Sequence, residues 1–166
     1  MTESAGKENA LLFLDVCAKI EGMTADLYHF YSRAFNADRE VSRLWKKTAL
    51  EEENHYRQIR LALKMLDQVE SLLLDDGLGA AYGIFHKLQK LVSGVKSNPP
   101  DLVTALKKSI EMEERLSFLH VDSSVRFKDE SVQQMFSSLR AADREHVSAL
   151  KRQLAIETVA FTEMRG

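Results

Sequence analysis

The stretch ALEEENHYRQIRLAL, residues 49–63, has the composition of a helix, but two polar residues interrupt its apolar stripe. Counting back from Leu66 in steps of three or four residues gives one helix face, made up of Ala62, Ile59, His55, Glu52, Thr48 and Trp45. Glu52 and His55 therefore occupy positions that the rest of the stripe predicts to be buried. Burying such groups costs free energy unless they are paired or bind a cation.

The whole chain predicts a single all-α domain. It has 166 residues, with only seven Gly and two Pro, and it is rich in residues that favour helix. Long helices are expected over 7–36, 38–66, 99–127 and 129–160, and a shorter one over 79–96. Pro99 or Pro100 suits the first turn of the third long helix, and Asp129 is a good N-cap for the fourth.

The lengths of the connections predict how these helices are arranged. The turns after the first and third long helices are very short, so 7–66 and 99–160 should each form an antiparallel hairpin. The crossover 67–98, with a Gly-marked turn and the short helix, is long enough to travel the length of a helix of about 45 Å. These lengths predict a four-helix bundle with up-down-down-up topology.

Composition excludes several classes of function. A formal net charge of −2 gives no reason to expect nucleic acid or an anionic membrane as a partner. No apolar run approaches the roughly 18–20 residues of a membrane span, and the N-terminus lacks the basic start and cleavage site of a signal peptide. The single cysteine, Cys17, excludes a disulfide or a Cys-x-x-Cys site within the chain. A cytoplasmic location is expected.

A polar interruption recurs on all four long helices. The interrupting residues are Glu21, Glu52, His55, Glu113, Asp143 and His146. Those of the second hairpin follow their equivalents in the first by 91 or 92 positions, which indicates an internal duplication. Within each hairpin, the two acidic residues are equidistant from the turn. All six should therefore meet at the middle of the bundle.

Four buried carboxylates would carry a charge of −4, and none of the four stripes holds a Lys or Arg to neutralise it. Two divalent cations supply +4. Carboxylate oxygen and imidazole nitrogen suit iron or manganese, and zinc would also fit. The six residues are therefore predicted metal ligands, and the alternative is a hydrated polar seam without metal. By helical phase, the flanking glutamates Glu51, Glu53, Glu111, Glu114 and Glu145 are expected on solvated faces.

Four motifs resemble the rubrerythrin branch of the ferritin-like superfamily. They are KIEGMTADLYHFY (19–31), LEEENHYRQI (50–59), SIEMEERLSFLH (109–120) and AADREHVSAL (141–150). The resemblance implies that Glu21 and Glu113 are lone carboxylate ligands, and that Glu52 with His55 and Asp143 with His146 are paired ligands. It also implies that Tyr28, and His120 at the equivalent position, orient the ligands and pass protons.

The sequence departs from that family in four places. His120 occupies the position equivalent to the aromatic Tyr28. Asp143 stands where the family usually has Glu, and Leu116 stands where rubrerythrins of the longer type carry a further Glu. The four cysteines of a rubredoxin-like domain are absent. Electrons would therefore have to come from a separate protein or from fresh Fe²⁺.

The resemblance implies a di-iron oxidoreductase that reduces H₂O₂ or O₂ with electrons from an external donor protein, and a homodimer. Two alternatives remain open. One is a ferroxidase or iron-handling protein, in which iron is the substrate. The other is a metal-free helical scaffold that binds a partner.

Overall fold

The computed structural model describes residues 3–66 and 77–164. It contains five helices: α1 (Glu3–Ala34), α2 (Arg39–Leu66), α3 (Leu78–Ser97), α4 (Leu102–Arg126) and α5 (Glu130–Glu163). No strand occurs in these two ranges. The predicted all-helical bundle is confirmed, and each predicted helix is present with ends that differ by a few residues.

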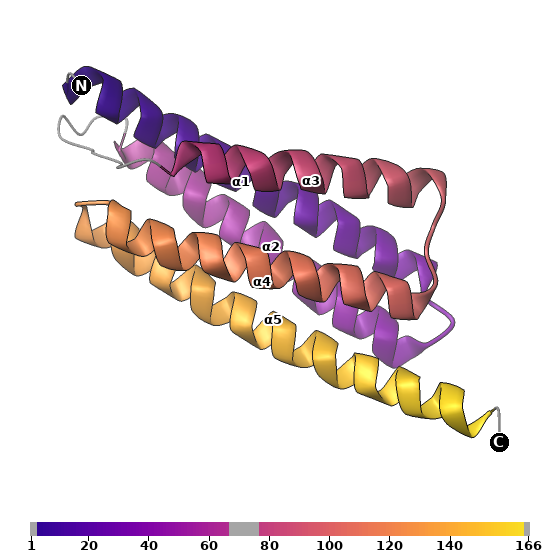
Figure 1. The fold of residues 1–166 in the computed structure, drawn as a ribbon. Coiled ribbons are helices and arrows are strands. Elements are labelled where there is room, and N and C mark those ends of the chain that lie inside the picture. Colours follow the sequence, from indigo (N-terminus) through magenta and orange to yellow (C-terminus); the bar gives the residue numbers. More distant parts are fainter. Residues whose placement is uncertain (1–2, 67–76, 165–166) are drawn as a thin grey trace.

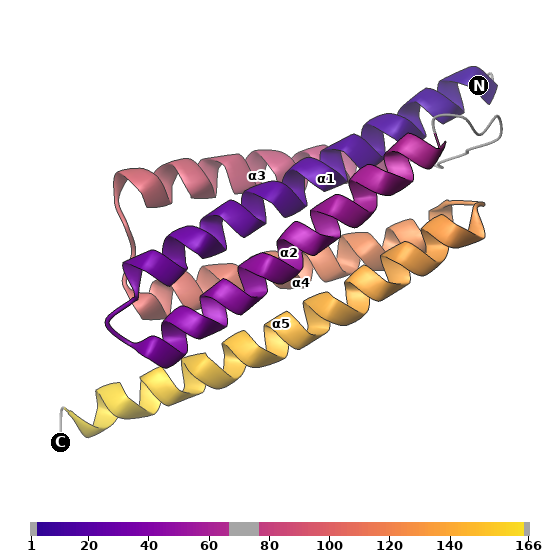
Figure 2. The ribbon, with the colours of Figure 1, turned by 180° about the vertical axis from the view of Figure 1, so that it is seen from behind.

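The long helices form two antiparallel hairpins, α1 with α2 and α4 with α5 (Figure 1). Helix α3 runs back along the bundle beside α1, and it buries Ala81, Leu88 and Val95. Figure 2 shows the same order from behind, with the C-terminal end of α5 extending past the other helices. The first part of the crossover, 67–76, lies outside the described residues.

An aspartate caps the start of three of the long helices. The Asp38 carboxylate accepts hydrogen bonds from the backbone N–H groups of Glu40 and Val41. Asp101 accepts one from Thr104 at 2.7 Å, and Asp129 caps α5 as predicted. The prediction that Pro99 or Pro100 opens α4 was wrong, because the cap at Asp101 starts the helix after both prolines.

Two aromatic clusters fill the core on either side of the bundle's middle. Toward one end, the Trp45 ring lies 5.2 Å from that of Tyr28 and 4.9 Å from that of Tyr31. Toward the other end, Phe13, Phe127 and Phe136 pack together with ring centroids 5.7–6.0 Å apart. Between these clusters the core changes from apolar to polar.

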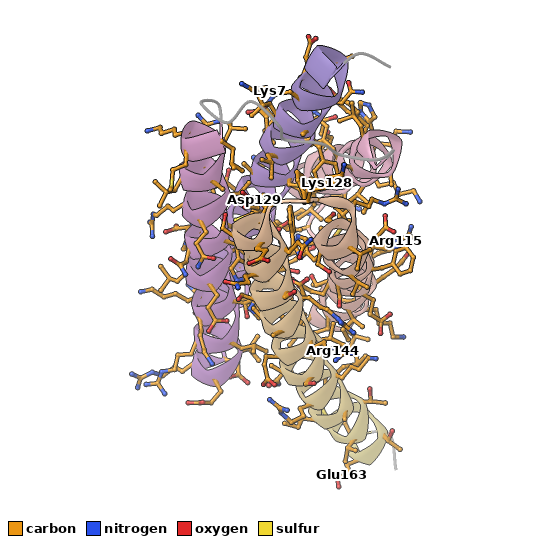
Figure 3. All side chains as sticks on the ribbon, turned by 90° about the vertical axis from the view of Figure 1, so that its left-hand side faces the viewer. Lys7, Arg115, Lys128, Asp129, Arg144 and Glu163 are labelled. Atoms are coloured by element: carbon orange, nitrogen blue, oxygen red, sulfur yellow. The ribbon has the colours of Figure 1, made fainter. Side chains whose placement is uncertain are left out.

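Charged side chains surround the bundle, and Lys128 and Asp129 mark the turn between α4 and α5 (Figure 3). Cys17 is buried, and burial together with the charge of Glu21 raises the pKa of its thiol. Among the helices described, none combines the length and the apolar composition needed to cross a bilayer.

Candidate metal centre

The six predicted ligands all lie in the buried polar layer between the aromatic clusters. The four carboxylate residues Glu21, Glu52, Glu113 and Asp143 are 0% exposed. His146 is 2% exposed and His55 is 5% exposed. Four different helices supply these side chains, which is why only the folded bundle brings them together.

A first group of donors comes entirely from the hairpin α1–α2. One donor atom each from Glu21, Glu52 and His55 lies within 4.8 Å of the others. His55 Nδ1 is 2.8 Å from Glu52 Oε2 and 3.4 Å from Glu21 Oε2. The Glu-x-x-His spacing places Glu52 and His55 on one face of α2, so both point at the same place.

A second group spans both hairpins and shares Glu52 with the first. It consists of Glu52, Glu113 and His146, again with donor atoms within 4.8 Å of one another. His146 Nδ1 is 2.9 Å from Glu52 Oε1 and 3.4 Å from Glu113 Oε2. Glu52 therefore turns one oxygen to each histidine, the geometry of a carboxylate that bridges two centres.

Asp143 is buried with the other five residues, but it belongs to neither group. Its Oδ2 accepts a hydrogen bond from His120 Nδ1 at 2.7 Å. His120 is fully buried, and its Nε2 lies 3.1 Å from Glu21 Oε1. Burial raises the pKa of Asp143, and the neighbouring His120 offsets part of this increase. The structure thus brings five predicted ligands into two groups and joins the sixth to a histidine.

Several donor atoms of this layer are buried without a hydrogen-bond partner. They are both oxygens of Glu21, Glu52 Oε1, Glu113 Oε2, His120 Nε2, Asp143 Oδ1 and His146 Nδ1. Some lie close to one another, yet without the alignment that a hydrogen bond requires. Unpartnered buried polar atoms are rare in folded proteins. Those of Glu21, Glu52, Glu113 and His146 belong to the two three-donor groups, where a bound cation would give them a partner.

The pKa values of the buried glutamates Glu52 and Glu21 shift in opposite directions. Burial, reinforced by the charges of Glu113 and Glu21, raises the pKa of Glu52 to about 8. Burial also acts to raise the pKa of Glu21, but the adjacent imidazoles of His120 and His55 outweigh it and lower that pKa. Within the described residues, every ion pair of these buried carboxylates is to a histidine.

The pKa values of the three histidines in the layer are all raised. Burial acts to lower their pKa values, but the surrounding carboxylates outweigh burial. The pKa values of His55 and His120 rise to about 10, and that of His146 rises to about 12. Without a cation, the layer therefore holds protons on its histidines to balance its carboxylates.

Tyr28 contacts the layer through its hydroxyl group. Its hydroxyl donates a 2.5 Å hydrogen bond to Glu113 Oε1, which leaves Oε2 of the same carboxylate facing His146. Burial, followed by the charges of Glu113 and Glu52, raises the pKa of the Tyr28 hydroxyl well above its usual value. Tyr28 therefore keeps its proton and fixes the orientation of Glu113.

Sequence reasoning missed the role of Glu51. We expected this residue on a solvated face, yet its Oε2 lies 2.7 Å from His146 Nε2 while its side chain is 42% exposed. His146 thus presents Nδ1 to the buried layer and Nε2 to a carboxylate. Such a carboxylate selects the tautomer and orientation of a metal-binding imidazole.

Replacing Glu51 with Gln is expected to weaken metal binding at the second group about 10- to 100-fold, because His146 loses the carboxylate that orients it. Isothermal titration with Mn²⁺ measures the change. Glu53→Gln is the matched control, since Glu53 also contacts a histidine at 2.7 Å, but that histidine is His29, outside the buried layer. Equal affinities for wild type and Glu51→Gln would contradict this role for Glu51.

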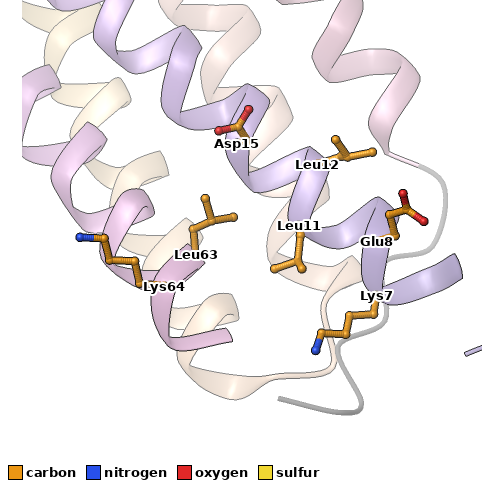
Figure 4. A pocket seen from close by; sticks show the side chains of 7 residues that line it. All are labelled: Lys7, Glu8, Leu11, Leu12, Asp15, Leu63 and Lys64. Atoms are coloured by element: carbon orange, nitrogen blue, oxygen red, sulfur yellow. The ribbon is translucent and has the colours of Figure 1, made fainter. Parts of the chain in front are cut away.

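Two hollows on the surface differ in whether residues of the candidate centre line them. The hollow in Figure 4 is formed by Lys7, Glu8, Leu11, Leu12, Asp15, Leu63 and Lys64. It lies between the start of α1 and the end of α2, and none of the six ligands lines it. A second hollow, along α2, includes Glu51 and His55 in its lining. The candidate centre therefore adjoins this hollow through His55.

No family model, curated protein sequence or solved structure matches the chain.

Proposed function

We propose that this chain is a di-metal carboxylate protein of ferritin-like architecture, in which two metal ions would share Glu52 as a ligand. The observation that carries the proposal is the pair of three-donor groups that share Glu52 in a fully buried layer. One ion would be held by Glu21, Glu52 and His55. The other would be held by Glu52, Glu113 and His146.

The donors fit divalent iron in number, type and charge. Each group offers two carboxylates and one imidazole, a mixture that iron and manganese accept and that zinc also tolerates. The two groups together hold three carboxylates, whose negative charge two divalent ions would neutralise, while the fourth buried carboxylate, Asp143, pairs with His120. Three protein residues at each centre leave coordination positions open for a small molecule.

The proposed activity is that of an oxidoreductase that reduces H₂O₂ or O₂. Iron bound by these residues would supply the two electrons that, with two protons, convert one H₂O₂ to two H₂O, and an external donor protein would return the electrons. The residues of the chain hold the site in place for this reaction. Tyr28 orients Glu113, Glu51 orients His146, and the aromatic clusters keep water from entering along the bundle axis.

The arrangement of the helices supports the same proposal. Helices α1 and α2 run in opposite directions, as do α4 and α5, and α3 carries the chain back along the bundle (Figures 1 and 2). These directions support the up-down-down-up order that the lengths of the connections predict. A homodimer, also implied by the resemblance, can be tested by light scattering during gel filtration.

The metal content of each chain tests the proposal directly. Protein expressed with iron and purified without chelator should contain about two irons per chain by elemental mass spectrometry, the number of three-donor groups. Stopped-flow oxidation of the ferrous protein by H₂O₂ and by O₂ then ranks the two oxidants. Continued uptake of Fe²⁺ beyond two ions per chain during oxidation would instead support iron storage. Absence of metal after anaerobic Fe²⁺ and Mn²⁺ titration would overturn the proposal.

A further inference from the structure

Asp143 and His120 form a buried pair that the proposed metal binding does not use. Both residues are 0% exposed, and a 2.7 Å hydrogen bond joins Asp143 Oδ2 to His120 Nδ1. Asp143 is the sequence equivalent of Glu52, which turns one oxygen to each site histidine. The aspartate side chain is about 1.5 Å shorter, the length of one carbon–carbon bond. It contacts α4 and takes part in neither three-donor group.

His120 also contacts Glu21, which belongs to the first group of donors. His120 Nε2 lies 3.1 Å from Glu21 Oε1, while the other oxygen of Glu21 lies 3.4 Å from His55 Nδ1. The duplication explains this contact, because Tyr28 and His120 are equivalent residues. Tyr28 of the first hairpin contacts Glu113 of the second, and His120 of the second contacts Glu21 of the first.

We propose that Asp143 is a positioning residue and not a metal ligand: it holds His120, and His120 fixes Glu21 at the first centre. This inference rests on the proposed metal binding. Among the described residues, it leaves Glu52 as the one carboxylate that the two proposed centres would share. It also means that Asp143 supports the first centre, whose residues lie on α1 and α2. The second centre, which contains the nearby His146, would not depend on Asp143.

If Asp143 were a ligand, the second centre would depend on it, and the first centre would not. Asp143 Oδ1 is buried without a hydrogen-bond partner. If that oxygen bound metal, it would do so beside His146, three residues further along α5. The two readings therefore differ in which centre depends on Asp143.

Variants with a single centre separate the two roles. His146→Gln leaves the first group as the complete one, and His55→Gln leaves the second. Asp143→Asn is introduced into each variant, and Mn²⁺ affinity is measured from the electron paramagnetic resonance signal of the free ion. We expect Asp143→Asn to weaken Mn²⁺ binding about 10- to 100-fold in the His146→Gln protein. In the His55→Gln protein we expect affinity to stay within about twofold, since its remaining centre does not use Asp143.

His120→Gln provides a second, independent variant for the same test. If Asp143 acts through His120, His120→Gln should also weaken the first centre alone, and adding Asp143→Asn should cause no further loss. Should Asp143→Asn lose its helical circular dichroism, His120→Gln in the two single-centre proteins decides the question. Asp122→Asn is the matched control, because Asp122 lies on α4 and pairs with Arg126 outside the layer.

Each outcome bears on one proposal or both. Loss of Mn²⁺ affinity in the His55→Gln protein, with none in the His146→Gln protein, would make Asp143 a ligand of the second centre and overturn this inference. The proposed di-metal function would survive that result. Absence of metal from the wild-type chain would overturn the function and this inference together.

Discussion

Replacing Glu52 with Ala is expected to remove both metal ions from the chain, whereas replacing Glu21 or His146 removes one. Glu52 is the residue common to the two three-donor groups. Its Oε2 lies 2.8 Å from His55 Nδ1, and its Oε1 lies 2.9 Å from His146 Nδ1. Elemental mass spectrometry after anaerobic loading with Fe²⁺ counts the ions retained by each variant.

The neighbouring Glu53 provides the control for this prediction. It is a glutamate on the same helix, but it contacts His29 and Arg57 near the surface. Glu53→Ala should retain both ions. Glu52→Gln keeps the side-chain volume and therefore separates loss of the carboxylate from loss of packing. A Glu52→Ala protein that still binds one ion per chain would show that Glu52 is not shared.

Metal removal is expected to make stability strongly dependent on pH. The folded metal-free chain holds protons at Glu52, His55, His120 and His146, whose pKa values are raised to between about 8 and about 12. A group with a raised folded pKa stabilises the fold below its unfolded pKa, and this stabilisation is lost as pH rises through the folded pKa. The melting temperature of the metal-free protein should therefore fall by several degrees between about pH 6.5 and pH 10.

Bound metal reverses this trend, because the ligands must release their protons to bind it. Metal affinity should rise with pH over the same range. Glu21 does not alter the expected sign, because its lowered pKa contributes stability that is already complete above about pH 4.5.

Melting curves at pH 6, 7, 8 and 9, with chelator and with saturating Mn²⁺, measure the effect. The gap between the two melting temperatures should widen with pH. Free Mn²⁺ at 100 times the dissociation constant adds about 2.7 kcal/mol for each ion bound. A metal-free melting temperature that stays constant or rises from pH 6.5 to pH 9 would contradict the protonation of the layer.

Helix order and the polar layer were predictable because both follow from periodicity. Glu52 and His55 interrupt an apolar stripe, and equal distances from the turns place each hairpin's acidic residues at one height. The start of α4 was harder to predict, since a proline in the first turn and an aspartate cap are both common. The cap at Asp101 decided it, because its carboxylate binds the N–H of Thr104.

Side-chain partners within the layer could not be predicted from helical phase alone. Glu51 follows Leu50 on the outer side of α2, and only the packing of α5 brings His146 Nε2 to it. Asp143 lies on the helix face where a ligand was predicted. Its side chain is shorter than that of glutamate, however, and it accepts a hydrogen bond from His120 on α4. Both cases depend on distances between helices, which the pattern of a single helix does not contain.

The distribution of the donors over the helices has a mechanical consequence. The first group belongs to α1 and α2 alone, whereas the second joins α2 to α4 and α5. An ion bound at the second centre would therefore be a cross-link between positions 52, 113 and 146, and it would restrict the chain as a disulfide does. Separating the two hairpins would require that ion to leave. The second centre would thus couple metal release to local opening of the bundle.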